Sequence, residues 1–69
     1  MERKVKIITE YITLGQFLKY VNIISSGAEA KMFLQENVLV VNGEKENRRG
    51  RKLYPGYLVE YQTEKYVIE

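Results

Sequence analysis

The strongest local constraint on this fold is the pair Asn42-Gly43, which directly follows the apolar run VLVV at residues 38–41. Asn-Gly is the preferred pair for a two-residue hairpin turn, because both residues tolerate positive φ angles. The run before it is short and β-branched, which is typical of a strand. A second turn is expected at Pro55-Gly56, a pair that suits the centre of a type II turn.

Two short helices are predicted upstream of this hairpin. The first begins with Thr13 and Gln16 in a capping-box pattern, and its apolar stripe consists of Leu14, Phe17, Leu18 and Val21. The second begins with Ser26 and Glu29 in the same pattern, and its stripe consists of Ala30, Phe33 and Leu34. Asn37 is suited to a left-handed residue at the end of this helix.

Strands are predicted on both sides of the helix pair. Val5 and Ile7 alternate with lysines near the N-terminus, and YLVEYQT and KYVIE follow the Pro-Gly turn with a turn near residues 63–65. The order of elements predicts one α+β domain over residues 1–69, in which two short helices pack on a small, mostly antiparallel sheet.

The 69 residues contain no cysteine and no histidine, and all nine acidic residues are glutamates. A chain without these groups lacks disulfides, the usual general base and the commonest metal ligand. We therefore expect no enzyme activity, no cofactor, no metal and no small-molecule substrate. No apolar run approaches the roughly 18 residues of a membrane span, and the N-terminus does not resemble a signal peptide. A cytoplasmic protein that does not bind membranes is expected.

Residues 45–52, which we call the basic segment, hold five bases and one acid, a net charge of +4. The rest of the chain holds six bases and eight acids, a net charge of −2. Arginine binds phosphate in bidentate fashion, and Gly50 is expected to let the segment bend. The segment is either a solvated loop or a phosphate-binding site. We predict the latter, with contacts from Lys45, Arg48, Arg49, Arg51 and Lys52.

Other candidates flank the basic segment. Ser26 and Gly27 form either a plain helix cap or, with free backbone N–H groups, a second phosphate site. Lys19 and Lys31 fall off the apolar stripes and are either generic surface lysines or further phosphate contacts. Aromatic side chains beside the Pro-Gly turn either pack structurally or stack on unpaired bases; these are Tyr54 and Tyr57.

The motifs resemble the RNA-binding domain named after ribosomal protein S-four, also called the alpha-L motif. In that family the first helix opens Arg-Leu-Asp-x-x-Leu, the second carries Ser-Arg-x-x-Ala, and Gly-x-Val-x-Val-Asn-Gly precedes a later Gly-Asp. The positions that match are Leu14, Leu18, Ser26, Ala30, Leu39, Val41, Asn42, Gly43 and Gly56. The match covers residues 12–61. ITLGQFLK, SSGAEAK and NRRGRKLYPG are similar to the stand-alone bacterial subgroup called YaaA.

The resemblance implies a free-standing RNA-binding protein that acts on ribosomal RNA or in ribosome assembly. We expect this protein to be a monomer. The sequence departs from the family pattern at Thr13 and Gly27, where arginines are usual, at Gly15, and at Tyr57 in place of the aspartate of Gly-Asp. The missing arginines shift the expected phosphate contacts to the basic segment. The alternative is a protein-interaction module that uses the apolar strand at 38–41 and a C-terminal edge strand.

Overall fold

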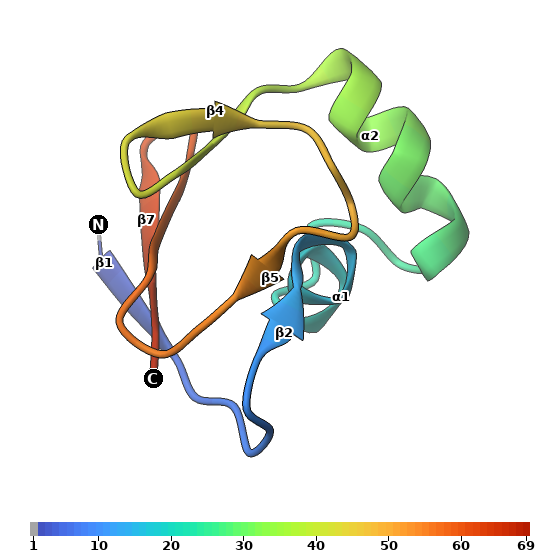
Figure 1. The fold of residues 1–69 in the computed structure, drawn as a ribbon. Helices are drawn as coiled ribbons and strands as arrows, with labels where there is room; N and C mark the ends of the chain where they lie inside the picture. The colour runs from blue at the N-terminus through green and yellow to red at the C-terminus, as the bar shows by residue number, and fades with distance from the viewer. Residues whose placement is uncertain (1) are drawn as a thin grey trace.

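The computed structural model describes residues 2–69 and contains a five-stranded sheet in the order β1-β7-β6-β3-β4 (Figure 1). The β1–β7 pair is parallel and the other three pairs are antiparallel. The strands are β1 (Glu2–Val5), β3 (Leu39–Val41), β4 (Glu44–Glu46), β6 (Leu58–Tyr61) and β7 (Glu64–Ile68).

A second, two-stranded sheet pairs β2 (Ile12–Thr13) with β5 (Lys52–Leu53). It leads directly into α1 (Leu14–Tyr20), and α2 (Ala30–Glu36) follows a single 3-10 turn at η1 (Gly27–Glu29). Figure 1 shows α1 beside the small sheet and α2 farther out on the same side. The predicted α+β class, with two short helices and a mostly antiparallel sheet, is confirmed. Neither helix is long enough to cross a bilayer within the described residues.

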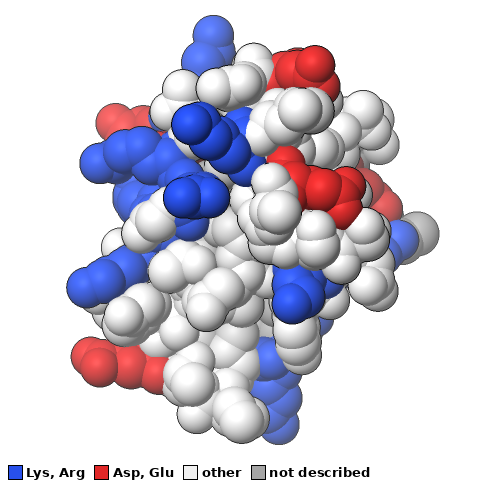
Figure 2. All heavy atoms as spheres, turned by 90° about the vertical axis from the view of Figure 1, so that its right-hand side faces the viewer, with Lys and Arg blue, Asp and Glu red and all other residues white. Residues whose placement is uncertain are grey.

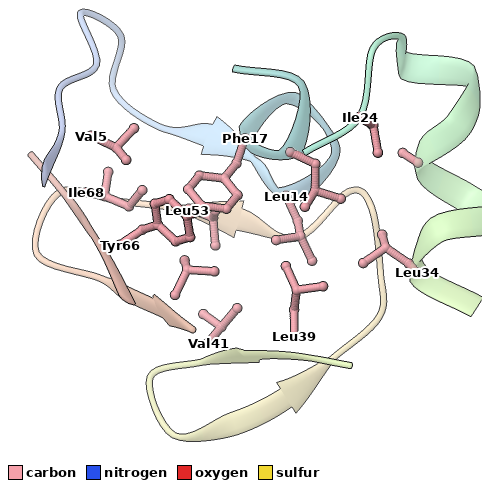
Figure 3. Close-up of a cluster of buried hydrophobic side chains, with 13 residues drawn as sticks. Val5, Leu14, Phe17, Ile24, Leu34, Leu39, Val41, Leu53, Tyr66 and Ile68 are labelled. Carbon is pink, nitrogen blue, oxygen red and sulfur yellow. The ribbon is translucent and has the colours of Figure 1, made fainter. Parts of the chain in front are cut away.

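The core lies between the five-stranded sheet and α1 (Figure 3). Phe17 points from α1 toward Tyr66 of β7, and the two rings meet edge to face with centroids 5.2 Å apart. Leu14 and Leu18 are fully buried, as the predicted stripe requires, and Leu34 joins them from α2. The strands contribute Leu39, Val41, Leu53, Val59 and Ile68, all with no exposed area.

Local hydrogen bonds confirm the predicted start of α1 and both predicted turns. Gln16 donates its backbone N–H to the hydroxyl of Thr13, which in turn donates its own N–H to the Gln16 side chain. Asn42 and Gly43 have φ angles of 51° and 86°. The Asn42 side-chain oxygen also accepts the Leu58 N–H at 2.9 Å, which ties the hairpin to β6. Gly56 has a φ of 97°, as position three of a type II turn requires.

The proposed interaction strands occupy the interior of the sheet, which corrects the alternative. β3 pairs with both β4 and β6, and β7 pairs with both β1 and β6. Residues 38–41 therefore do not form an edge, and the C-terminal strand does not either. Leu39 and Val41 point into the core, while Val38 precedes the strand and is 60% exposed. The sheet edges are β1 and β4, which are charged at most positions.

Three local predictions differ from the structure. Asn37 is extended, with a φ of −129°, and its side chain instead donates to the Phe33 carbonyl. The left-handed residue at a helix end is Asn22, after α1. The turn before β7 is centred on Gln62 and Thr63, where Gln62 has a φ of 57°. β1 begins at Glu2, ahead of the predicted strand.

Gly43→Ala tests the hairpin constraint. An L-residue in the left-handed region is strained, so we expect the free energy of unfolding to fall by about 1–2 kcal/mol. Gly50→Ala is the matched control, because Gly50 has no left-handed φ and open space lies where a Cβ would stand. This variant should leave stability unchanged or raise it by up to about 1 kcal/mol, because alanine lowers the conformational entropy of the unfolded chain. Urea unfolding measures both, and equal losses would contradict the assignment.

Candidate nucleic-acid interface

The basic segment is fixed to the first turn of α1. Leu14 donates its N–H to the Arg51 carbonyl at 2.8 Å, and Gly15 donates to the Arg49 carbonyl at 2.9 Å. First-turn N–H groups have no partner within their own helix, so the segment satisfies them. Lys52 then pairs with Thr13 in the small sheet, and Leu53 enters the core. Figure 1 shows the chain after β4 running past α2 to this point.

Gly15 lies directly against the basic segment, with room for a Cβ at ordinary van der Waals distance. A Cβ at Gly15 would lie 3.4 Å from both the Cβ and the carbonyl oxygen of Arg49, and 3.6 Å from the Cβ of Ala30. Three segments therefore meet at this glycine: α1, the start of α2 and the basic segment. An aspartate, usual here in the related pattern, would have to place its carboxylate among them.

Glu46 is the one buried charged residue among residues 2–69. Its carboxylate accepts Nε and Nη2 of Arg48 at 2.8 and 3.0 Å, and Nη1 of Arg51 at 2.7 Å. It also accepts the backbone N–H of Arg48 at 3.1 Å. The hydrogen bonds from the Arg48 side chain lower the pKa of Glu46 to about 2, against burial, which acts to raise it. The acid in the basic segment thus organises two of its arginines.

The three arginines of the segment differ in their surroundings. Arg48 and Arg51 end a tight turn closed by the Arg51 N–H and the Arg48 carbonyl at 3.1 Å. The Arg51 side chain is 26% exposed and lies over the Tyr57 ring, 5.9 Å from its centroid. Arg49, at the tip, is exposed, and its side chain has no hydrogen bond or ion pair within residues 2–69. The turn does not use the conformational freedom of Gly50, contrary to the expected role.

The structure brings Lys31 of α2 next to the basic segment. Lys31 and Arg49 line one surface hollow together with Leu34, Gln35 and Asn47. Lys45 lines the adjoining hollow, which shares Asn47 with the first. Figure 2 views the molecule from this side and shows lysine and arginine side chains gathered at its upper left. Cations that are far apart in the sequence therefore share a surface.

Lys19 and Lys52 lie in other surroundings. Lys19 lines a separate hollow with Thr9, Ile12, Gln16 and Tyr20. Lys52 extends over the ring of Tyr11, with Nζ 4.9 Å from its centroid. Their roles in phosphate binding stay predictions, and Lys52 has a local aromatic partner that the sequence did not indicate.

The turn before α2 is already occupied by a carboxylate. Glu29 accepts the backbone N–H groups of Ser25 and Ser26 at 3.2 and 3.1 Å, and it also accepts the Ser25 hydroxyl. These bonds, the Ser25 hydroxyl first, lower the pKa of Glu29. Gly27 has no heavy atom within 4 Å of where its Cβ would stand. A phosphate at Ser26 and Gly27 would therefore meet a negative neighbour, and this second site stays a prediction.

Three tyrosines form a row beside the basic segment. The Tyr54 ring lies 5.7 Å from both the Tyr11 and the Tyr57 rings, tilted by 48° and 59° respectively. All three are half-buried. Tyr11 was not singled out from the sequence, because its partners follow some forty positions later. Base stacking by Tyr54 and Tyr57 stays a prediction. Within residues 2–69, no cluster of carboxylates could hold a metal ion.

The substitution Glu46→Gln tests whether the charged Glu46 carboxylate stabilises the basic segment. Because the folded pKa lies below the ordinary value of 4.5, the ionised carboxylate stabilises the fold above pH 4.5, and this contribution is lost as the pH falls toward 2. We expect the variant to be less stable than the wild type by about 1–3 kcal/mol at pH 7. The difference should shrink between pH 4.5 and 2.

Glu44→Gln is the control for that experiment, because Glu44 lies on the same strand and is exposed. Urea unfolding at several pH values should show a change for Glu44→Gln within about 0.5 kcal/mol. A pH-independent deficit in Glu46→Gln would mean that the carboxylate charge does not stabilise the segment.

Comparison with known proteins identifies the family of this chain. The family model described as S4 domain matches residues 5–69. The chain is also 55% identical over 62 residues to a protein of Bacillus subtilis (strain 168) named "Probable ribosome maturation protein RlbA". That match spans 90% of this chain and 87% of the relative. The family match covers nearly all of the chain, including both helices, the hairpin and the anchored basic segment, and the protein therefore belongs to the S4 domain family.

Proposed function

We propose that this protein binds structured RNA, with ribosomal RNA as its target, and acts without catalysis in ribosome maturation. The observation that carries the proposal is the shared surface of the basic segment and α2, where Arg49 and Lys31 line one hollow. The relative's name concerns ribosome maturation, and the identity extends over most of both chains. That similarity supports the same process here, which takes place in the cytoplasm, and we expect the protein to act as a monomer.

Phosphate is the ligand that this surface suits best. Each lysine or arginine that neutralises a phosphate releases bound counterions, which gives a salt-dependent and largely sequence-independent affinity. The backbone of the segment is already fixed through Leu14 and Gly15 of α1. Less conformational entropy is therefore lost on binding than for a free loop.

Recognition of shape fits the surface better than recognition of bases. Duplex RNA hides its base edges in a deep, narrow major groove and exposes phosphates and hydroxyls. The rings of Tyr54 and Tyr57 are half-buried and tilted against neighbours rather than offered flat to solvent. We assign them first to supporting the segment, with base stacking as a secondary role. Lys45, Lys52, Arg48 and Arg51 supply the remaining phosphate contacts. Lys19, Ser26 and Gly27, which do not line this hollow, are further candidate contacts.

Charge reversal at the shared hollow tests the proposal. We expect Arg49→Glu and Lys31→Glu each to weaken binding to protein-free ribosomal RNA by about tenfold at 0.1 M salt. Each should also reduce the slope of log affinity against log salt by about 1. Filter-binding titrations at several salt concentrations measure both quantities.

Lys4→Glu is the matched control, because it makes the same change in net charge on the exposed edge strand β1. It should change affinity by less than about twofold, since separate surface charges are screened at this salt. The proposal fails if the wild type shows no salt-dependent RNA binding. An equal loss in all three variants would move the site away from the basic segment.

A further inference from the structure

We infer that the outward edges of Arg48 and Arg51 form a preorganised site for a single RNA phosphate, and that Glu46 is its positioning residue. The inference rests on the proposed RNA binding and concerns which part of the surface distinguishes structured RNA from any polyanion. The Glu46 carboxylate is buried, and a charge is seldom buried unless it is paired and fully hydrogen-bonded.

Both arginines retain donors for a ligand. A guanidinium carries five N–H groups. Arg48 gives Glu46 one from Nε and one from Nη2, which leaves three. Arg51 gives one from Nη1, which leaves four. The carboxylate therefore holds one edge of each side chain and leaves the rest available for phosphate oxygens.

The spacing of the two cations is fixed by a shared atom. Oε1 of Glu46 accepts Nη2 of Arg48 at 3.0 Å and Nη1 of Arg51 at 2.7 Å. Two like charges would otherwise separate, and here they stay side by side. The Tyr57 ring also contacts Arg51. The hydrogen bond from the Arg51 N–H to the Arg48 carbonyl closes the backbone turn that joins the two residues.

The pair is open to a ligand on one side. The Arg48 side chain is 71% exposed and the Arg51 side chain is 26% exposed, whereas the Glu46 side chain between them is 6% exposed. A phosphate approaching from solvent meets the guanidinium groups and not the carboxylate. A phosphodiester offers two charged oxygens on one phosphorus, and neighbouring guanidinium groups match such a pair through charge-assisted hydrogen bonds.

Glu46 has opposite effects on general and selective binding. Its charge removes one unit from the field of the segment, which lowers the affinity for any polyanion. Its hydrogen bonds order two long side chains before binding, which reduces the entropy lost when they meet a phosphate. An ordered pair favours RNA that holds a phosphate in a fixed place over a flexible strand. Arg49 lacks such a partner and contributes charge without this selectivity.

The experiment compares affinities for protein-free ribosomal RNA and for poly(U), an unstructured strand, at the same salt concentration. Glu46→Asp, Arg48→Lys and Arg51→Lys all keep the net charge but break the shared geometry, since aspartate is shorter and lysine lacks the fork. Each should weaken ribosomal RNA binding by about three- to tenfold and change poly(U) binding by less than about twofold. Arg49→Lys, also charge-neutral, should leave both affinities within about twofold.

The outcomes separate the two claims. The positioning role of Glu46 is wrong if the ratio of ribosomal RNA affinity to poly(U) affinity stays at the wild-type value in all three variants. It is also wrong if Arg49→Lys lowers this ratio as much as they do. If the wild type binds neither RNA, the proposed function itself fails. Arg48→Lys keeps the test valid if Glu46→Asp does not fold, because Arg48 is mostly exposed. Circular dichroism at the assay temperature confirms that each variant is folded.

Discussion

The hydrogen bonds from the first turn of α1 to the basic segment connect the core to the surface. Leu14 and Gly15 donate to the carbonyls of Arg51 and Arg49, so backbone groups that would face water are paired. Leu14 is itself fully buried, which makes the position of the segment depend on the packing of α1. A charged stretch that looks like a loop in the sequence therefore belongs to the folded body.

Glu46 also holds the basic segment in place, through hydrogen bonds from the side chains of Arg48 and Arg51. Burying a carboxylate is costly unless hydrogen bonds and opposite charges compensate, and here two arginines and a backbone N–H do so. The desolvation cost comes mainly from Glu46, because the Arg48 side chain remains mostly exposed to water. The pairing therefore stabilises the fold while it also fixes the positions of both arginines. Its structural result is a set of cations whose spacing does not depend on a ligand.

Most of the fold could be predicted because its signals are local. The Asn42-Gly43 turn and the capping box of Thr13 and Gln16 each depend on residues within a few positions. The pairing of β2 with β5 could not be predicted, because two-residue strands have no periodicity and join residues forty positions apart. Glu46 was missed for a related reason. An acid among bases resembles a solvated charge, and only the tertiary fold shows that it is buried.

The departures from the family pattern fit together in the same way. Thr13 caps α1 through its hydroxyl, and Gly15 donates its N–H to the Arg49 carbonyl. Arg3, the remaining arginine, pairs with Glu64 near the opposite edge of the sheet. The basic segment instead brings the backbone of Arg49 and Arg51 to the start of α1. The first turn of α1 thus supports a segment that carries three of the four arginines of the chain.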